Sequence, residues 1–301
     1  MNDLNTLQQI QATLTGGSMQ IRWWNPVKGF AGNEISEAAE AMNADREVIS
    51  ARKKVLDIHH PAWKGVVGIR TQVRNWWDHN TLPYVFSGVR LLRIQNLPEM
   101  MTELATYTAE LAVAVQALDA ALPDLVERAR DRMGRLFDPT VYPASFKGMF
   151  GFEFRERSIE PPSYLRHTNA EEYKRQLARS LEDIGASMKK FEAQCWNRLS
   201  DLTARLQQMT SEGGAVYGST LSNFQKLFDQ VATLNFEGTQ CFQEALGEAR
   251  EILDGVTPEE LRASQGLRQE VYAKAGAMAR RFEQLGSTVA EVTQDQGLAV
   301  A

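Results

Sequence analysis

The chain has few of the residues that supply covalent, redox or metal chemistry. Its 301 residues include two cysteines and four histidines. Cys195 and Cys241 both fall on helical apolar stripes, so we expect reduced, buried thiols and a cytoplasmic location. The formal net charge of −5 is modest. It therefore indicates neither a nucleic-acid partner nor an acidic solvating tail.

The sequence also has no long hydrophobic run, and we expect no secretory signal. The best membrane candidate, residues 111–122, is shorter than the roughly 20 residues that a span needs and contains Gln116 and Asp119. The first residues include Asp3 and have no basic segment followed by a continuous apolar one, which argues against a secretory signal. We therefore do not expect a membrane as a partner.

The recurring catalytic sequence motifs are missing too. The sequence has no phosphate-binding loop, no dinucleotide-binding glycine turn and no nucleophile elbow. Its carboxylate pairs, Glu171-Glu172 and Glu259-Glu260, fall in first helical turns, where the helix dipole already accounts for them. We expect no catalytic residue and no cofactor, and hence a protein that is not an enzyme.

What the sequence does contain is long amphipathic periodicity. Leu97, Leu104, Leu111, Leu118 and Leu125 stand at intervals of seven, and Pro123 inside this series predicts a kink or a break near residues 119–122. The pattern predicts a mainly α fold, an elongated bundle of long, coiled-coil-like helices with a small two-stranded β element. The helices are expected over residues 97–137, 168–212, 220–253 and 258–293.

The N-terminal third is organised differently and holds five of the six tryptophans. Glycines and a proline in residues 1–32 predict an irregular or partly helical segment. Residues 33–165 are expected to form a helical region that carries the β element, with its first helix reaching residue 58. Residues 166–301 are expected to form the long-helix bundle, packed on the preceding region as one elongated unit.

Two stretches, residues 84–94 and 149–157, have the composition of strands. Phe150, Phe152 and Phe154 alternate with small or charged residues, which is typical of a half-buried strand. Because a lone strand leaves its backbone groups unpaired, we expect the two stretches to pair with each other. The phenylalanine face should then pack onto helices of the same chain.

Histidines are the weak candidates for a metal site. His59, His60 and His79 lie near aspartates, which gives donors of the kind that bind zinc or non-haem iron. However, no spacing places two imidazoles on one helical face, and Pro61 follows the first pair directly. The stronger interpretation is that these histidines are exposed or hydrogen-bonded at helix ends.

Six aromatic residues are candidates for a recognition surface. Arg70 and Arg74 accompany the tryptophans and provide the ingredients of a single-stranded nucleic-acid groove. The favoured interpretation is a stripe in the core or at a protein interface, so nucleic acid is not the expected partner. The six residues are Trp63, Trp76, Trp77, Phe150, Phe152 and Phe154.

Four short motifs between residues 50 and 165 resemble an uncharacterised family of bacterial and phage proteins that is classified as a domain of unknown function. They are residues 52–57 (RKKVLD), 88–92 (GVRLL), 97–99 (LPE) and 150–154 (FGFEF). Genes of that family often neighbour a MoxR-type AAA ATPase and a protein with a CobT-like von Willebrand A domain. The resemblance implies a non-catalytic component of an ATPase-linked system and transfers no catalytic residue.

The leading functional prediction is an interaction protein, a scaffold or adaptor that binds a protein partner or itself. It rests on long helical stripes in a sequence without catalytic motifs. One alternative is a metal-binding protein or enzyme that uses the histidines named above. The other is a helical pore-forming protein in which the phenylalanine-rich β element acts as a membrane-inserting tongue.

Overall fold

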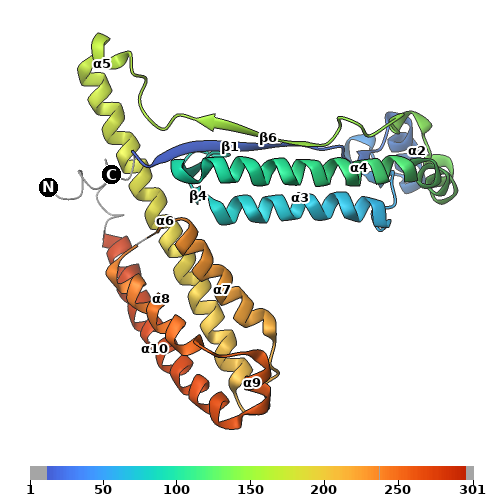
Figure 1. The fold of residues 1–301 in the computed structure, drawn as a ribbon. Helices are drawn as coiled ribbons and strands as arrows, with labels where there is room; N and C mark the ends of the chain where they lie inside the picture. Colours follow the sequence, from blue (N-terminus) through green and yellow to red (C-terminus); the bar gives the residue numbers. More distant parts are fainter. Residues whose placement is uncertain (1–11, 237, 296–301) are drawn as a thin grey trace. The chain divides into compact units, whose positions relative to one another are not determined.

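A computed structural model describes residues 12–236 and 238–295, with the side chains of the last helix described as far as Phe282. Helix accounts for 66% of the structure, so the prediction of a mainly α fold is confirmed. The chain divides into two compact units. Unit 2 contains residues 13–79 and 92–158, and the described part of unit 1 contains residues 12, 80–91, 159–236 and 238–295. Figure 1 shows the helices and strands of both units.

A long antiparallel ribbon forms the sheet of unit 2. β1 (Leu14–Arg22) pairs with β6 (Gly151–Arg157) from Gly16 opposite Arg157 to Arg22 opposite Gly151. The end of β5 (Arg90–Arg93) adds to the other side of β1, where the amide of Ile94 donates to the carbonyl of Thr13 at 3.0 Å. The ribbon therefore joins segments that lie far apart in the sequence.

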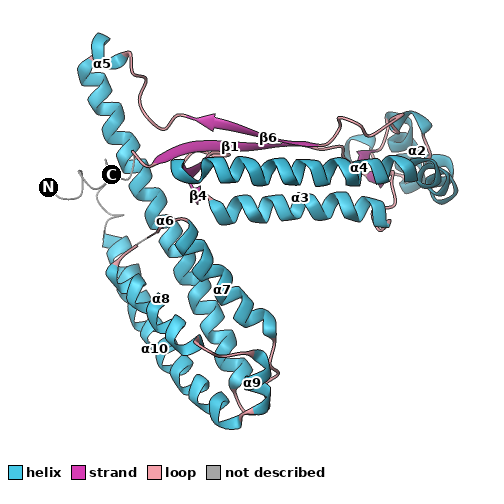
Figure 2. Ribbon diagram, in the orientation of Figure 1, coloured by secondary structure: helices cyan, strands magenta, loops and turns pink. Residues whose placement is uncertain are grey.

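Two long helices, α3 (Pro61–Asn80) and α4 (Leu97–Met133), lie side by side in unit 2, as Figures 1 and 2 show. Four of the five leucines at seven-residue spacing are buried, and Leu118 and Leu125 are fully inaccessible. Leu111, Leu118 and Leu125 meet aromatic and aliphatic side chains of α3 and of the segment before β6. The predicted leucine stripe of α4 is therefore the stripe that builds the core.

The remaining elements of unit 2 are short. β2 (Val27–Gly29) pairs with β3 (Arg52–Lys54) in a separate two-stranded sheet, and α2 (Gly32–Met42) lies between them in sequence. Single 3₁₀ turns cover Arg46–Val48, Ile94–Asn96, Gly134–Leu136 and Pro139–Val141.

Unit 1 is built on one 41-residue helix, α6 (Ala170–Thr210), preceded by the short α5 (Leu165–Thr168). The helices α7 (Gly218–Thr233), α8 (Gln240–Leu253), α9 (Pro258–Ala263) and α10 (Gln265–Asp295) complete the bundle, and α7, α8 and α10 each contact α6. β4 (Leu82–Pro83) pairs with the start of β5 and contacts α6.

The starts of the unit 1 helices follow the capping residues in the sequence. Asn169 accepts the amide of Glu172 at the start of α6, and Thr257 with Glu260 forms a reciprocal capping box at α9. Glu192 of α6 accepts the amide of Thr239 at 3.1 Å, just before α8. These bonds satisfy amide groups that the first turn of a helix leaves unpaired.

The predicted strand at residues 149–157 exists, but the predicted two-stranded β element was wrong in the number of its strands and in their pairing. β6 pairs with β1, in the segment that we expected to be irregular or partly helical, and not with residues 84–94. Of that second stretch only Arg90–Arg93 is a strand. The error came from interpreting Gly16 and Gly17 as breakers, although both lie inside β1. Gly17 is needed there because a side chain would collide with Phe154 and Leu92. Residues 1–11 of the predicted irregular segment lie outside the described residues.

Several predicted helix ends were also wrong. α2 stops at Asn43, which has φ of 49°, so the helix expected to reach residue 58 ends early. The helix expected over 220–253 is two helices, because Asn235 and Gly238 both have positive φ. The extended backbone of Ser264 likewise separates α9 from α10. The proline predicted a kink or a break near residues 119–122, and α4 continues through Pro123 without a break.

Candidate functional site

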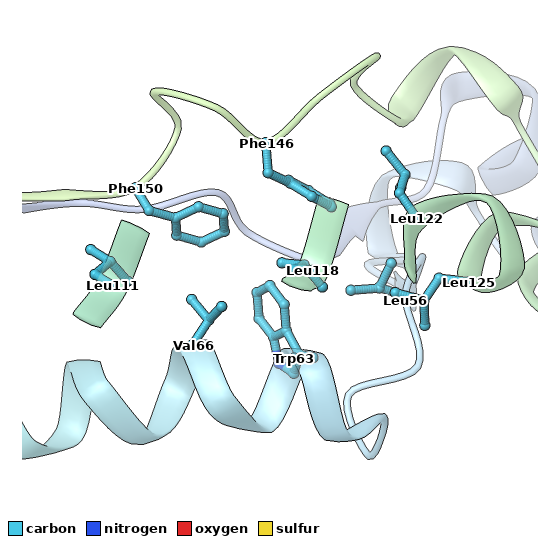
Figure 3. Close-up of a cluster of buried hydrophobic side chains, with 9 residues drawn as sticks. All are labelled: Leu56, Trp63, Val66, Leu111, Leu118, Leu122, Leu125, Phe146 and Phe150. Atoms are coloured by element: carbon cyan, nitrogen blue, oxygen red, sulfur yellow. The ribbon is translucent and has the colours of Figure 1, made fainter. Parts of the chain in front are cut away.

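An aromatic cluster occupies one end of the core of unit 2. The Trp23 ring meets Phe150 edge-on with centroids 4.8 Å apart, and Trp63 lies 6.1 Å from Trp23 and 6.2 Å from Phe150. Edge-on contacts place the positive ring edge on the negative face of the neighbouring ring. Figure 3 shows Phe150 and Trp63 directed toward each other from opposite sides of the core.

The six aromatic residues that the sequence marked for recognition lie within this core or at its margin. Trp63 is 5% exposed, and Trp77 and Phe150 are each 7% exposed. Phe152 packs against the aromatic cluster, and Phe154 lies 6.1 Å from the Trp77 ring. Trp76 is half-buried beside Tyr107. The phenylalanine face thus packs onto helices of its own chain, with Glu153 and Arg155 exposed.

The structure gives the first two candidate histidines local backbone roles. Asp57 accepts the amide of His59 at 3.0 Å, and His60 Nδ1 accepts the amide of Ala62 at 3.3 Å in the first turn of α3. His79 lies in the last turn of α3, which is 20 residues long. His60 directly precedes the first turn, so the two histidines lie at opposite ends of this helix. Among the described residues, no three His, Cys, Asp or Glu side chains are arranged so that they could hold one metal ion.

A small pocket lies beside His59, between β3 and the last turns of α4. It has a volume of about 180 Å³ and is lined by four side chains that carry or can carry positive charge and by one carboxylate. Asp57 holds a depressed pKa, first because it accepts the His59 amide, and Arg132 at 3.6 Å adds to the effect. The charged or ionisable lining residues are Lys54, Asp57, His59, Arg128 and Arg132.

The outward side of α4 is unusual because it carries no charge over about six turns. Every residue of this side is exposed. Thr102 and Thr106 turn their hydroxyls to the carbonyls of Pro98 and Thr102 at 3.0 and 3.2 Å, so their hydrogen-bonding groups are satisfied within the helix. We call this surface the α4 face; it consists of Thr102, Ala105, Thr106, Ala109, Ala112, Val113, Gln116, Ala120 and Pro123.

A second exposed apolar feature lies in unit 1, in the loop between β4 and β5. Val85 is 47% and Phe86 is 59% exposed, whereas the neighbouring Tyr84 is 8% exposed. The Phe86 ring meets the Tyr84 ring at 5.3 Å, which holds it beside the buried tyrosine. The loop is therefore anchored by one aromatic side chain and presents another to solvent.

Sequence reasoning missed both the pocket and the α4 face. The α4 face was detectable, because the positions opposite the leucine stripe between Glu103 and Asp124 are Ala, Thr, Val, Gln or Pro. The pocket was not detectable, since Lys54 and Arg132 are 78 positions apart and come together only in the folded unit.

Comparison of the chain with protein-family models, with curated proteins and with solved structures finds no match. The resemblance to the uncharacterised bacterial and phage family therefore stays a prediction. In the part of the chain that the structure describes, no helix combines the length and the apolar character needed to cross a membrane.

Proposed function

We propose that the protein is a non-catalytic adaptor of the bacterial or phage cytoplasm, and that the α4 face receives a helix of a partner protein. The observation that carries this proposal is the uncharged outward side of α4. A solvated helix ordinarily presents charged residues to water, and here Val113 is 69% exposed among alanines and threonines.

The chemistry of the α4 face favours another helix as its occupant. Small side chains let two helix backbones approach closely, and side chains of both helices then interdigitate. The threonines of the face bond to their own helix, so a partner does not have to satisfy their hydroxyls. A face of this kind suits an apolar, uncharged helix stripe and disfavours an acidic or basic segment.

The resemblance of residues 50–165 to the ATPase-linked family supports the choice of a MoxR-type AAA ATPase, or a protein associated with it, as the partner. This part of the proposal rests on the short motifs alone. The α4 face belongs to the same stretch of chain as those motifs, because α4 begins at Leu97 within the LPE motif.

The buried phenylalanine face gives less support to the pore-forming alternative. Forming a tongue would require β6 to leave β1 and would expose Phe150, which now packs against Trp23 and Trp63. Exposing one such buried ring costs about 1.5–3 kcal/mol in transfer free energy. The alternative therefore requires a rearrangement of the core of unit 2.

The test introduces a negative charge into the α4 face and compares its effect on partner binding with that of the same substitution at an exposed position of α6. Ala109→Glu alters the face, and Ala204→Glu is the matched control at an exposed alanine of α6. The full-length chain and both variants are used with cross-linking mass spectrometry in native lysate. We expect cross-links from α4 to a partner that Ala109→Glu abolishes and Ala204→Glu retains, with all three melting temperatures equal.

Two outcomes would contradict the proposal. If Ala109→Glu kept every cross-link of the parent chain, the α4 face would not be the binding surface. If light scattering showed a dimer that Ala109→Glu converted to a monomer, the occupant would be a second copy of this chain and not a separate partner.

A further inference from the structure

The pocket between β3 and α4 collects positive charge in a way that the adaptor proposal does not use. β3 brings Lys54, the turn before α3 brings His59, and the last turns of α4 bring Arg128 and Arg132. The two arginines are four residues apart, so they lie on the same side of α4. With the lysine and arginines charged, Asp57 ionised and His59 neutral, the lining carries a net charge of +2, from 3 − 1.

Most of the hydrogen-bond donors in this pocket are not used by the protein itself. Among the described residues, Lys54 has no ion-pair or side-chain hydrogen-bond partner. Arg128 uses its Nε for Asp124, at 2.9 Å, and the two terminal nitrogens of its guanidinium have no recorded partner in the described structure. Arg132 approaches Asp57 only to 3.6 Å, which is longer than a hydrogen bond.

The single lining carboxylate is already committed. Asp57 accepts the amide of His59 in a tight turn, so its charge is fixed at one side of the pocket and its orientation is set by the backbone. The pocket therefore has donors in excess of acceptors. It is about 180 Å³ in volume, which leaves space for an ion of the size of phosphate.

We propose that this pocket binds a phosphate group, as the free ion or as a small phosphomonoester. Two guanidinium groups and one ammonium match a doubly charged tetrahedral oxyanion better than a singly charged carboxylate. A guanidinium presents a planar fork of donors to two oxygens of the same phosphate, and the ammonium of Lys54 adds a point charge. This proposal does not depend on the proposed adaptor function.

The test is a calorimetric titration of the full-length chain with inorganic phosphate at constant ionic strength. We expect saturable binding that weakens about tenfold in Lys54→Gln and in Arg132→Gln, since each removes a charge-assisted hydrogen bond. Asp57→Asn should bind more tightly, because it removes the lining negative charge and keeps an oxygen for the His59 amide. Arg135→Gln is the control, since Arg135 is exposed at the same end of unit 2 and does not line the pocket.

Two further titrations identify the ligand. Glycerol phosphate binding more tightly than inorganic phosphate would assign the pocket to a phosphomonoester, and the reverse order would assign it to the free ion. Acetate binding as tightly as phosphate would overturn the proposal, as would the absence of saturable phosphate binding by the parent chain. Equal weakening by Arg135→Gln and Arg132→Gln would show general charge attraction and would overturn it too. Melting temperatures measured for each variant confirm that the fold is retained.

Discussion

Gly17 of β1 lies directly against the ring of Phe154 of β6, so closely that a Cβ atom at Gly17 would stand 2.6 Å from Phe154 Cε2. The same Cβ would stand 2.6 Å from Leu92 Cδ1. The glycine thus leaves the space in which the Phe154 ring and Leu92 pack beside β1. This contact explains why a glycine is found inside a nine-residue strand.

Gly17→Ala should therefore destabilise unit 2. The added methyl group overpacks the site, and overpacking of a core costs about 1–3 kcal/mol. Urea unfolding followed by circular dichroism measures the change in the free energy of unfolding. Gly29→Ala is the control, because a Cβ at Gly29 in β2 meets nothing within 4 Å. Equal unfolding free energies for the two variants would show that Phe154 and Leu92 adjust freely.

The leucine stripe of α4 gives a second prediction. Leu111 is 3% exposed in the core, whereas Val113, two residues along the same helix, is 69% exposed. Leu111→Ala should cost about 2–5 kcal/mol, because it loses transfer free energy and leaves a cavity. Val113→Ala should change the free energy of unfolding by no more than about 0.5 kcal/mol in the isolated chain. A small loss at Leu111 would mean that the stripe does not face the core in solution.

The long helices were predictable because their evidence is local. Apolar spacing identified α4 and α6, and the capping residues Asn169 and Thr257 placed two starts close to the observed ones. The breaks at Asn235 and Ser264 were missed, because neither residue is a strong breaker by itself and a single glycine such as Gly238 can be tolerated inside a helical pattern. Asn235 breaks the helix with a positive φ, and Ser264 breaks it with an extended backbone. The packing of the folded chain selects these backbone angles, and the local sequence does not.

The sheet and the pocket were harder to predict because they depend on partners distant in sequence. β1 pairs with a strand more than 100 residues away, and Gly17 makes sense only once Phe154 and Leu92 are beside it. The phenylalanine alternation in β6 correctly identified the strand and its buried face, but it contains no information about which strand lies next to it. Lys54 and Arg132 likewise acquire a shared role only after folding.

A buried ion pair in unit 2 predicts acid sensitivity. The Lys53 ammonium pairs with Glu34 of α2 and donates to the carbonyl of Leu136 at 3.0 Å. The pKa of Glu34 lies below its ordinary value of 4.5, chiefly because of the hydrogen bond from Lys53. A carboxyl group with a lowered pKa contributes stability above its unfolded-state pKa, and this contribution is lost as the pH falls through the folded-state pKa.

Unfolding free energy measured from pH 7 down to pH 3 should therefore fall more steeply in the parent chain than in Glu34→Gln, which has no carboxylate to protonate. The variant should also be less stable than the parent at pH 7, since it leaves the Lys53 charge without its counterion. Glu40→Gln, at an exposed position of α2, is the control and should keep the parent slope. Identical slopes for the parent and Glu34→Gln would refute the assignment.

The two thiols should differ sharply in reactivity. Cys195 is 3% exposed in α6, and burial raises the pKa of its thiol to about 12. At pH 8 roughly one such thiol in ten thousand is ionised, so an aromatic disulfide reagent should react with Cys195 only when the helix bundle opens. Cys241 lies in the first turn of α8 with intermediate exposure, and it should react first.

In native buffer, one equivalent of aromatic thiolate should be released rapidly from the reagent, and a second should be released at the rate of unfolding. In denaturant, both equivalents should be released at once. Cys241→Ser should remove only the rapid phase, and Cys195→Ser only the slow one. Because the slow phase reports the opening of the α6 core, Leu199→Ala, which creates a cavity one turn from Cys195, should accelerate it. Rapid labelling of Cys195 in native Cys241→Ser would show that the bundle of unit 1 opens far more readily than its packing indicates.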